Sequence, residues 1–178
     1  MRPFISAADD PGTARREDSN VTAAIRPFAP ADADRIVELS LAAWQPVFKS
    51  FRDVLGAALY ERVHPDWRAA QTDSVMDALR TNDSWVSTNE GAITGFVNVR
   101  FDAAERSGEI YMIAVDPACQ RQGIATRLTE HALDEMRARG LDLAIVATGG
   151  DPGHAPARRT YERAGFTGCP QVWYARQL

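Results

Sequence analysis

The sequence contains few of the residues that build metal centres or disulfide frameworks. Its 178 residues include two cysteines, Cys119 and Cys169, and three scattered histidines. Neither residue type recurs at the spacing of a metal-ligand motif, so no bound metal is predicted. Two unpatterned cysteines favour reduced thiols in a cytoplasmic protein over the disulfide framework of a small secreted one.

Long apolar runs and an excess of positive charge are also lacking. Residues 1–20 mix small, charged and turn-forming residues, and we interpret them as a loose tail, not a secretory signal or a membrane anchor. The formal net charge of -4 argues against broad nucleic-acid binding. We therefore expect neither a nucleic-acid partner nor a membrane partner.

What the sequence does contain is the composition of a globular domain. Hydrophobic residues make up 45% of the chain and charged residues 25%, which is enough apolar surface for one core. No internal repeat or low-complexity linker interrupts the chain after residue 20. Residues 21–178 are therefore predicted to form a single domain.

Hydrophobic periodicity predicts a mixed α/β (α+β) fold. The predicted elements are a strand over 21–28, helices over 31–44, 47–60 and 66–79, strands over 84–88, 92–101 and 109–115, a helix over 121–139, a strand over 143–148, a helix over 156–164 and a strand over 171–175. Pro46 is predicted to end the first helix, because proline cannot donate a helical hydrogen bond. An antiparallel meander followed by a parallel strand–helix–strand crossover predicts a central mixed sheet.

A glycine-centred bend, Gln120-Arg121-Gln122-Gly123, lies between a predicted strand and a predicted helix. The first N–H groups of a helix have no intrahelical acceptor and carry partial positive charge, so such a junction can bind phosphate. Gly123 lets an oxygen-rich ligand approach the backbone, and Arg121 can add a charged contact. The bend lacks the signatures of nucleotide-triphosphate and dinucleotide loops, so a pyrophosphate held mainly by amides is predicted.

Two stretches resemble the signatures of the GNAT N-acetyltransferase superfamily. The stretch "QRQGIA" at 120–125 is similar to the family's pyrophosphate loop, Gln/Arg-x-x-Gly-x-Gly/Ala, and "ARRTYERAGF" at 157–166 is similar to Ala-x-x-x-Tyr-x-x-x-Gly-Phe. The resemblance covers residues 21–174 in element order. It implies acetyl-CoA as co-substrate, a sheet splayed to admit the pantetheine arm, and direct transfer of the acetyl group to an amine in a ternary complex.

The same resemblance implies a set of cofactor-binding positions along the strand, the loop and the last helix. The implied acetyl-CoA contacts are Ile113, Ala114, Val115, Arg121, Gln122, Gly123, Ile124, Ala125, Thr126 and His154. Many members of the family carry asparagine where this sequence has His154. A side-chain amide contact to the pantetheine arm is therefore not assumed at that position.

Tyr161 and Glu109 are the catalytic candidates. In the family pattern the Tyr161 hydroxyl points at the cofactor sulfur and can protonate the departing thiolate, whereas packing alone is the other interpretation. In some members, including histone acetyltransferases, a glutamate at the place of Glu109 is the general base. The alternative for Glu109 is a solvent-facing strand start, with ordered water as the base. Period-two alternation predicts Glu109, Tyr111, Ile113 and Val115 on one face.

The sequence leaves the acceptor and the assembly open. The acceptor is expected to be a small amine or a protein or peptide amine. Trp44, Phe48, Phe51 and Tyr60 lie on the early helices that wall the acceptor site in the family, although core packing also explains them. The rival functions are a non-catalytic acyl-CoA-binding sensor and a structural domain that binds no CoA. Dimers are common in the family, so a homodimer is one expectation.

Overall fold

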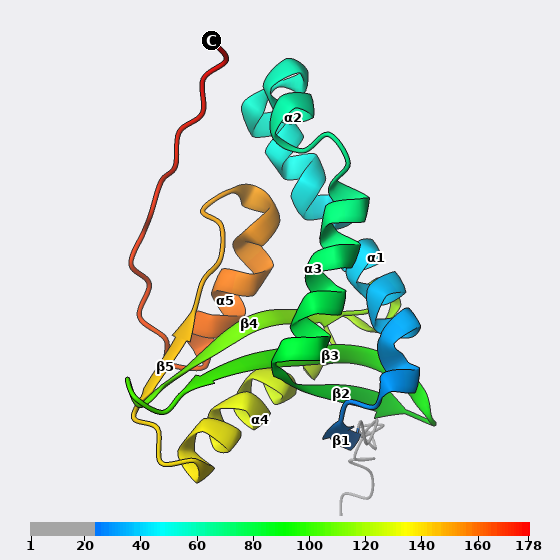
Figure 1. The fold of residues 1–178 in the computed structure, drawn as a ribbon, viewed down its shortest axis with the longest axis vertical. Helices are drawn as coiled ribbons and strands as arrows, with labels where there is room; N and C mark the ends of the chain where they lie inside the picture. The colour runs from blue at the N-terminus through cyan, green and yellow to red at the C-terminus, as the bar shows by residue number, and fades with distance from the viewer. Residues whose placement is uncertain (1–23) are drawn as a thin grey trace, which may run out of the picture.

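A mixed five-stranded sheet carries the fold, in the strand order β1-β2-β3-β4-β5 (Figure 1). The computed structural model describes residues 24–178, so the predicted tail over 1–20 lies outside the described residues. The strands are β1 Ala24–Pro27, β2 Asp83–Asn89, β3 Ala92–Asp102, β4 Ser107–Val115 and β5 Leu143–Val146. The pairs from β1 to β4 are antiparallel and β5 is parallel to β4, which confirms the predicted meander and crossover.

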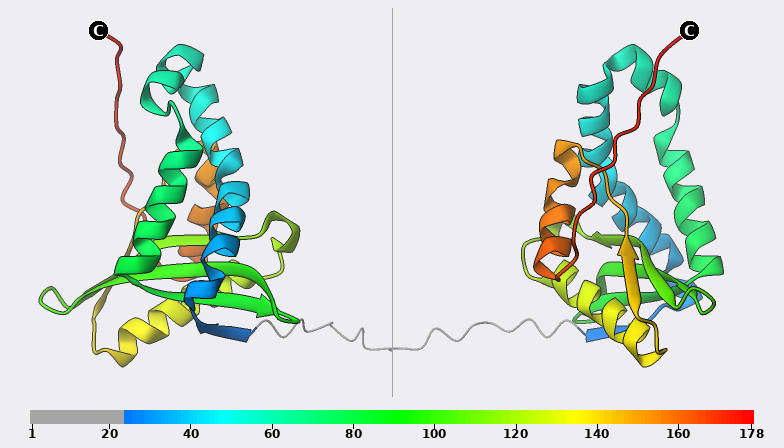
Figure 2. Two further views of the ribbon diagram at one scale, coloured as in Figure 1. Left: turned by 45° about the vertical axis from the view of Figure 1, so that its right-hand side comes forward. Right: turned by 90° about the vertical axis from the view of Figure 1, so that its left-hand side faces the viewer.

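Helices cover both faces of the sheet, and each face has its own apolar core (Figure 2). The helices are α1 Ala33–Leu55, α2 Ala57–Val63, α3 Trp67–Thr81, α4 Ile124–Ala138 and α5 Ala155–Arg163, with short 3-10 turns η1 Pro30–Asp32, η2 Pro117–Cys119 and η3 Pro152–His154. Ile36 of α1 and Val75 of α3 pack on Phe96 on one face. Leu128 of α4 packs on Val97 on the other.

Helix α1 contradicts the prediction that Pro46 ends the first helix. The helix runs through Pro46 to Leu55 and ends at Gly56, which has a φ of 74°. A proline inside a helix removes one hydrogen bond and destabilises it by roughly 3 kcal/mol. Packing beyond the proline offsets this loss, because Val47 and Ser50 are buried and the Ser50 hydroxyl accepts from the Gly153 N–H at 3.0 Å.

Strand β4 contains a bulge that overturns the predicted period-two alternation. Asn98 pairs with Met112 but the next residue of β3, Val99, pairs with Ile110, so Tyr111 is an extra residue. Ile113 packs with the core under α4, whereas Met112 packs with the core under α1 and α3. Glu109 is therefore not on the same face as Ile113 and Val115.

The predicted strand over 171–175 is absent from the described chain. Residues 164–178 contain no helix or strand, and Val172, Trp173 and Tyr174 are 74%, 56% and 91% exposed. In both views of Figure 2 this segment runs away from the sheet. The apolar pattern of residues 171–175 did not suffice to predict a strand, because a strand also needs a neighbouring strand that pairs with its backbone.

Strands β4 and β5 diverge part-way along β4. The last paired residues are Ile110 and Val146, yet β4 continues to Val115. Beyond Ile110 the backbone N–H and C=O groups on this side of β4 consequently have no partner in β5. This divergence confirms the predicted splay of the sheet.

Aromatic side chains pack around His64 where the end of α1, helix α2 and the start of α3 meet. Phe51 stacks on the His64 ring at 5.4 Å, and Phe48 stacks on Trp67 at 4.2 Å. The His64 Nε2 atom is buried without a hydrogen-bond partner in residues 24–178. Burial lowers the pKa of His64 below its ordinary value, so folding favours the neutral form of this ring.

We predict that acid destabilises the fold partly through His64. The unfolded chain takes up a proton near pH 6.5, whereas the folded chain does so only at lower pH. The contribution of His64 to stability is therefore complete above this pH and is lost as the pH falls below it. The fall in Tm between about pH 7.5 and about pH 5.5 should be smaller for His64→Gln than for the wild type. Equal falls would contradict this role for His64.

Candidate functional site

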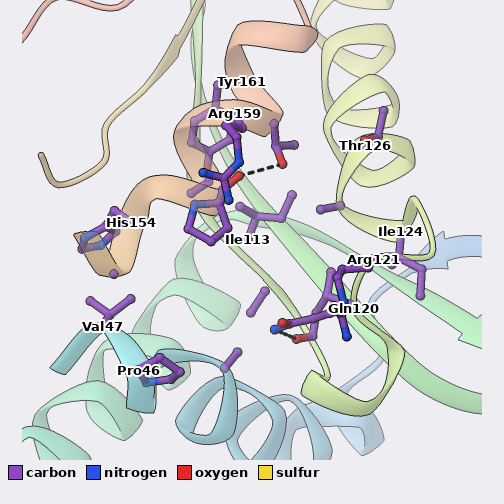
Figure 3. Close-up of a pocket in the computed structure, with 18 of the residues that line it drawn as sticks. Pro46, Val47, Ile113, Gln120, Arg121, Ile124, Thr126, His154, Arg159 and Tyr161 are labelled. Carbon is purple, nitrogen blue, oxygen red and sulfur yellow. Dashed lines mark hydrogen bonds between the residues drawn. The ribbon is translucent and has the colours of Figure 1, made fainter. Parts of the chain in front are cut away.

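A cavity of about 500 Å³ opens where β4 and β5 diverge (Figure 3). Four segments far apart in the chain form its walls: α1, the end of β4, the loop into α4, and η3 with α5. The lining residues are Ala43, Trp44, Pro46, Val47, Ile113, Ala114, Val115, Gln120, Arg121, Gly123, Ile124, Ala125, Thr126, Gly153, His154, Pro156, Ala157, Arg159, Thr160, Tyr161 and Arg163. The cavity thus brings together every predicted site residue except Gln122 and Glu109.

The loop from β4 into α4 is held in a defined shape by polar contacts. The Gln120 side-chain amide donates to the Val115 carbonyl at 3.1 Å. The Asp116 carboxylate accepts from the Ala118 N–H at 2.8 Å and pairs with Arg35 of α1. These contacts tie the loop to both the strand that precedes it and the helix that faces it.

The end of the loop presents the first amides of α4 to the cavity. Gly123 caps the helix with a left-handed backbone, at a φ of 76°. The first helical hydrogen bond runs from the Arg127 N–H to the Gly123 carbonyl, so the N–H groups of residues 124–126 have no intrahelical acceptor. Gln122 lies in this loop with an exposed side chain, and only its carbonyl is bonded, by Arg127 at 3.4 Å.

Positive charge dominates the cavity. Arg121, Arg159 and Arg163 line it, and its described lining contains no aspartate or glutamate. Together with the positive end of the α4 dipole, these guanidinium groups favour a ligand with several phosphate charges. The predicted phosphate-binding role of the loop is therefore consistent with its surroundings.

Tyr161 occupies the α5 wall of the cavity as a neutral hydroxyl. It is 7% exposed, and its ring meets Phe166 edge to face with centroids 6.0 Å apart. Burial raises the pKa of Tyr161 to about 12. The side chain can therefore donate a hydrogen bond into the cavity throughout the physiological pH range.

A histidine and a carboxylate form a pair at the η3 end of the cavity. His154 Nδ1 is hydrogen-bonded to the Asp151 carboxylate, which also accepts from the Gly153 N–H at 2.9 Å. Burial alone would raise the pKa of Asp151, but hydrogen bonds from Ser50, His154 and Gly153 hold it below its ordinary value. Asp151 was not among the sequence candidates, although Asp-Pro before a helix is a recognisable start signal.

Glu109 lies in a second cavity of about 550 Å³ and does not line the first one. Its carboxylate is 3.5 Å from Arg100 Nη1, and the same guanidinium lies over the Tyr111 ring at 3.4 Å from the centroid. The role of Glu109 as general base stays a prediction.

The early aromatic residues divide between the cavity and the helix ends. Trp44 lines the cavity. Phe48 and Phe51 instead pack around His64, and Tyr60 is buried in that same cluster. Most of the predicted acceptor aromatics thus pack around His64 at the ends of α1 and α2 and do not line the cavity.

Comparison with known proteins places this arrangement in a family. The profile of the Acetyltransferase (GNAT) family matches residues 48–166, a span that includes both Gly123 and Tyr161. The chain belongs to the GNAT acetyltransferase family. No helix in residues 24–178 of this GNAT protein is long and apolar enough to cross a membrane, and those residues contain no His/Cys/Asp/Glu cluster suited to a metal ion.

The chain is similar to curated proteins with two different named activities. A mycothiol acetyltransferase from Amycolatopsis mediterranei is 31% identical over 154 residues, which cover 80% of this chain and 46% of that protein. The S-(2-succino)cysteine N-acetyltransferase of Bacillus subtilis is 27% identical over 140 residues, which cover 76% of this chain and 78% of that protein. This GNAT protein matches only 21% to 46% of the length of the mycothiol acetyltransferases.

A solved GNAT structure confirms the fold. The aminoglycoside N-acetyltransferase AAC(6')-Iy in complex with CoA matches with a TM-score of 0.57 and 16% identity, over 86% of this chain and 93% of that one. At this identity the likeness concerns the arrangement of sheet and helices in this GNAT protein. The family resemblance inferred from the two sequence motifs is confirmed by the family match over residues 48–166.

Proposed function

We propose that this GNAT protein is an N-acetyltransferase that transfers an acetyl group from acetyl-CoA directly to a primary amine within a ternary complex. One observation supports the proposal above others: the free amides of α4 and the Tyr161 side chain line a single cavity. A phosphate site and a proton donor in one cavity are what acetyl transfer from an acyl-CoA requires.

The residues of the cavity fit acetyl-CoA. The amides after Gly123, with Arg121, would hold the pyrophosphate. The backbone of β4 at Ile113 and Ala114 would bond the amides of the pantetheine arm, because β5 has diverged there. Acetyl-CoA would supply the acetyl group as a thioester, which breaks its C–S bond as the acceptor nitrogen bonds to the carbonyl carbon.

The protein's own contribution at the reacting end is the placement of a proton on Tyr161. Its neutral hydroxyl would donate to the departing sulfur and so stabilise the negative charge that develops there. His154 lies at the start of the same helix and lines the same cavity. Either a pantetheine contact or a role toward the acceptor is compatible with that position.

The acceptor is proposed to be a small molecule or peptide with a primary amine. Both named relatives above act on thiol-derived compounds according to their names, which favours a small amine linked to a cysteine. Trp44 and Val47 of α1 would contact that acceptor, because they line the wall opposite α5. An acetyl-CoA turnover assay across amines, cysteine derivatives and peptides tests this choice.

We predict that acetyl-CoA raises the Tm by about 5–10 °C at roughly 100 times its Kd. A ligand that binds only the folded state adds about 2.7 kcal/mol of stability at that concentration, and each kcal/mol shifts the Tm of a domain of this size by about 2–4 °C. Differential scanning fluorimetry, with CoA and ATP as comparison ligands, measures the shift. An unchanged Tm at saturating acetyl-CoA would contradict the proposed cofactor.

The Tm shift with acetyl-CoA and the acetyl-CoA turnover assay together distinguish an enzyme from a sensor. A sensor would show the Tm shift with acetyl-CoA but release no free thiol with any amine of the panel. An enzyme would show both. A structural domain would show neither.

A further inference from the structure

The His154–Asp151 pair has the construction of a general base, and it forms within a short turn. Asp151 caps η3 by accepting from the Gly153 N–H, and His154 ends the same turn and caps α5. The His154 and Asp151 side chains are 16% and 9% exposed. The ring is thus largely enclosed yet lines the cavity.

Close backbone packing fixes the position of this turn. A Cβ on Gly153 would lie 2.8 Å from the Ser50 Cβ and 3.0 Å from the Val47 Cα, so the turn touches α1 directly. The Phe51 ring lies 5.6 Å from the His154 ring on the same side. The imidazole therefore sits between α1, which carries the proposed acceptor wall, and α5, which carries Tyr161.

The Asp151 contact determines which ring nitrogen is available. An ionised carboxylate can only accept, so the proton of neutral His154 resides on Nδ1 and the lone pair on Nε2. A carboxylate behind an imidazole holds this tautomer and stabilises the cation that forms when Nε2 takes a proton. Both effects serve a base.

Helix geometry brings this base toward the reacting end of the cavity. His154 and Tyr161 are seven residues apart, which is about two turns or 10 Å along α5. Helical side chains lean toward the N-terminus, so the Tyr161 side chain extends back toward the turn. Both side chains line the cavity on the α5 side (Figure 3). An acceptor amine and a thioester carbon would occupy the space between them.

We propose that His154 is the general base that deprotonates the acceptor amine, with Asp151 as its positioning residue. The inference rests on the proposed N-acetyltransferase function. Nε2 first takes one proton from the ammonium form of the acceptor. The neutral nitrogen then bonds to the carbonyl carbon as the C–S bond breaks, Tyr161 gives one proton to the sulfur, and the nitrogen loses its second proton to solvent. His154 then loses its proton to solvent and Tyr161 regains one, so both residues return to their starting states.

The groups around His154 come from three segments. On its own turn the ring is hydrogen-bonded to the Asp151 carboxylate, and Arg158 of α5 donates to the carbonyls of Gly149 and Asp151. From α1 the neighbours are the uncharged Ser50 hydroxyl and the Phe51 ring. Arg159 lines the same cavity and adds positive charge. Asp151 is the one anion that these contacts place against the ring.

The test compares kcat/KM between about pH 6 and pH 9.5 for the wild type, His154→Asn, His154→Gln and Asp151→Asn, with one amine acceptor. Asparagine is the residue that many family members carry at this position, so His154→Asn keeps an amide for the pantetheine arm and removes the base. We expect kcat/KM to fall by about 10²-fold near neutral pH and to recover partly as the pH approaches the pKa of the amine. Acetyl-CoA affinity should stay within about threefold.

Asp151→Asn should lower kcat/KM by about tenfold or more and shift the acidic limb of the profile, because the ring loses its anionic partner. His131→Gln, a histidine of α4 outside the cavity, is the matched control and should keep the wild-type profile. Tm values in the presence of acetyl-CoA confirm folding, and His154→Gln supplies a second variant if the first is unstable.

Three results would overturn the proposal. If the acidic limb of the pH profile of kcat/KM is unchanged in both His154 variants, His154 is not the general base. Loss of acetyl-CoA affinity with an unchanged kcat would make His154 a cofactor contact. If the acidic limb of the pH profile of kcat/KM disappears in Glu109→Gln but persists in His154→Asn, the general base is Glu109 in the second cavity. A wild-type protein that binds acetyl-CoA but acetylates no amine would instead contradict the proposed function itself.

Discussion

Replacing Tyr161 with phenylalanine is expected to lower kcat by about 10²-fold or more while acetyl-CoA affinity stays near the wild-type value. The substitution keeps the ring, and with it the edge-to-face contact with Phe166. It removes only the hydroxyl of a residue that is 7% exposed and lines the cavity. Binding and turnover should therefore separate in this variant.

The raised pKa changes how Tyr161 is expected to act. A phenol with a pKa of about 12 is a weak acid toward a thiolate in water, which takes up its proton near pH 8.5, and full transfer would be uphill by roughly 5 kcal/mol. The burial that keeps the proton on Tyr161 also disfavours a bare anionic sulfur. Donation therefore accompanies C–S cleavage instead of preceding it.

Stopped assays of free thiol and calorimetric titration of acetyl-CoA measure the two quantities for Tyr161→Phe. Ionisation of Tyr161 should not reduce the wild-type rate until the pH approaches 12, because the hydroxyl remains protonated below it. Full turnover in Tyr161→Phe would remove the proton donor from the mechanism. A matching loss of acetyl-CoA affinity would assign the residue to binding.

Gly123→Asp is expected to weaken acetyl-CoA binding by about 10²-fold or more, which is roughly 3 kcal/mol. The new carboxylate would lie beside the amides that are proposed to hold the pyrophosphate, and two like charges would repel each other there. The Cβ itself meets only Arg127 at 3.7 Å, so the fold has room for it. The loss should therefore appear in affinity.

Two further variants separate charge from backbone strain. Gly140 has a φ of 71° and no atom within 4 Å of an added Cβ, so Gly140→Asp introduces a similar strain at the far end of α4. Gly123→Ala adds the Cβ without the charge. Calorimetric titration should give wild-type affinity for Gly140→Asp and a smaller loss for Gly123→Ala. Wild-type affinity in Gly123→Asp would mean that the phosphate site lies elsewhere.

The parts of the site that depend on local signals were predicted from the sequence. The bend at Gly123 needs a left-handed residue between a strand and a helix, and glycine is the residue that adopts this conformation readily. The hairpin between β2 and β3 is similar, because Glu90 and Gly91 both have positive φ in its turn. Such features are set by residues next to each other in the chain.

The errors arose where distant segments decide the outcome. The face of Glu109 depends on the bulge at Tyr111, which exists only in the pairing of β4 with β3. The continuation of α1 past Pro46 depends on contacts with Gly153, more than a hundred residues later. The pairing of Asp151 with His154 is local, but its place in the cavity follows from the packing of η3 on α1.

The two walls of the cavity are built from different parts of the chain, and this difference bears on how the protein can change during evolution. The wall proposed to bind the cofactor is formed by the end of β4 and the start of α4, where backbone amides without a β5 or intrahelical partner persist when side chains are exchanged. The wall from α1 is formed by Ala43, Trp44, Pro46 and Val47. Under the proposed function, point substitutions in α1 can therefore alter the accepted amine in a descendant lineage while the proposed acetyl-CoA site is inherited unchanged.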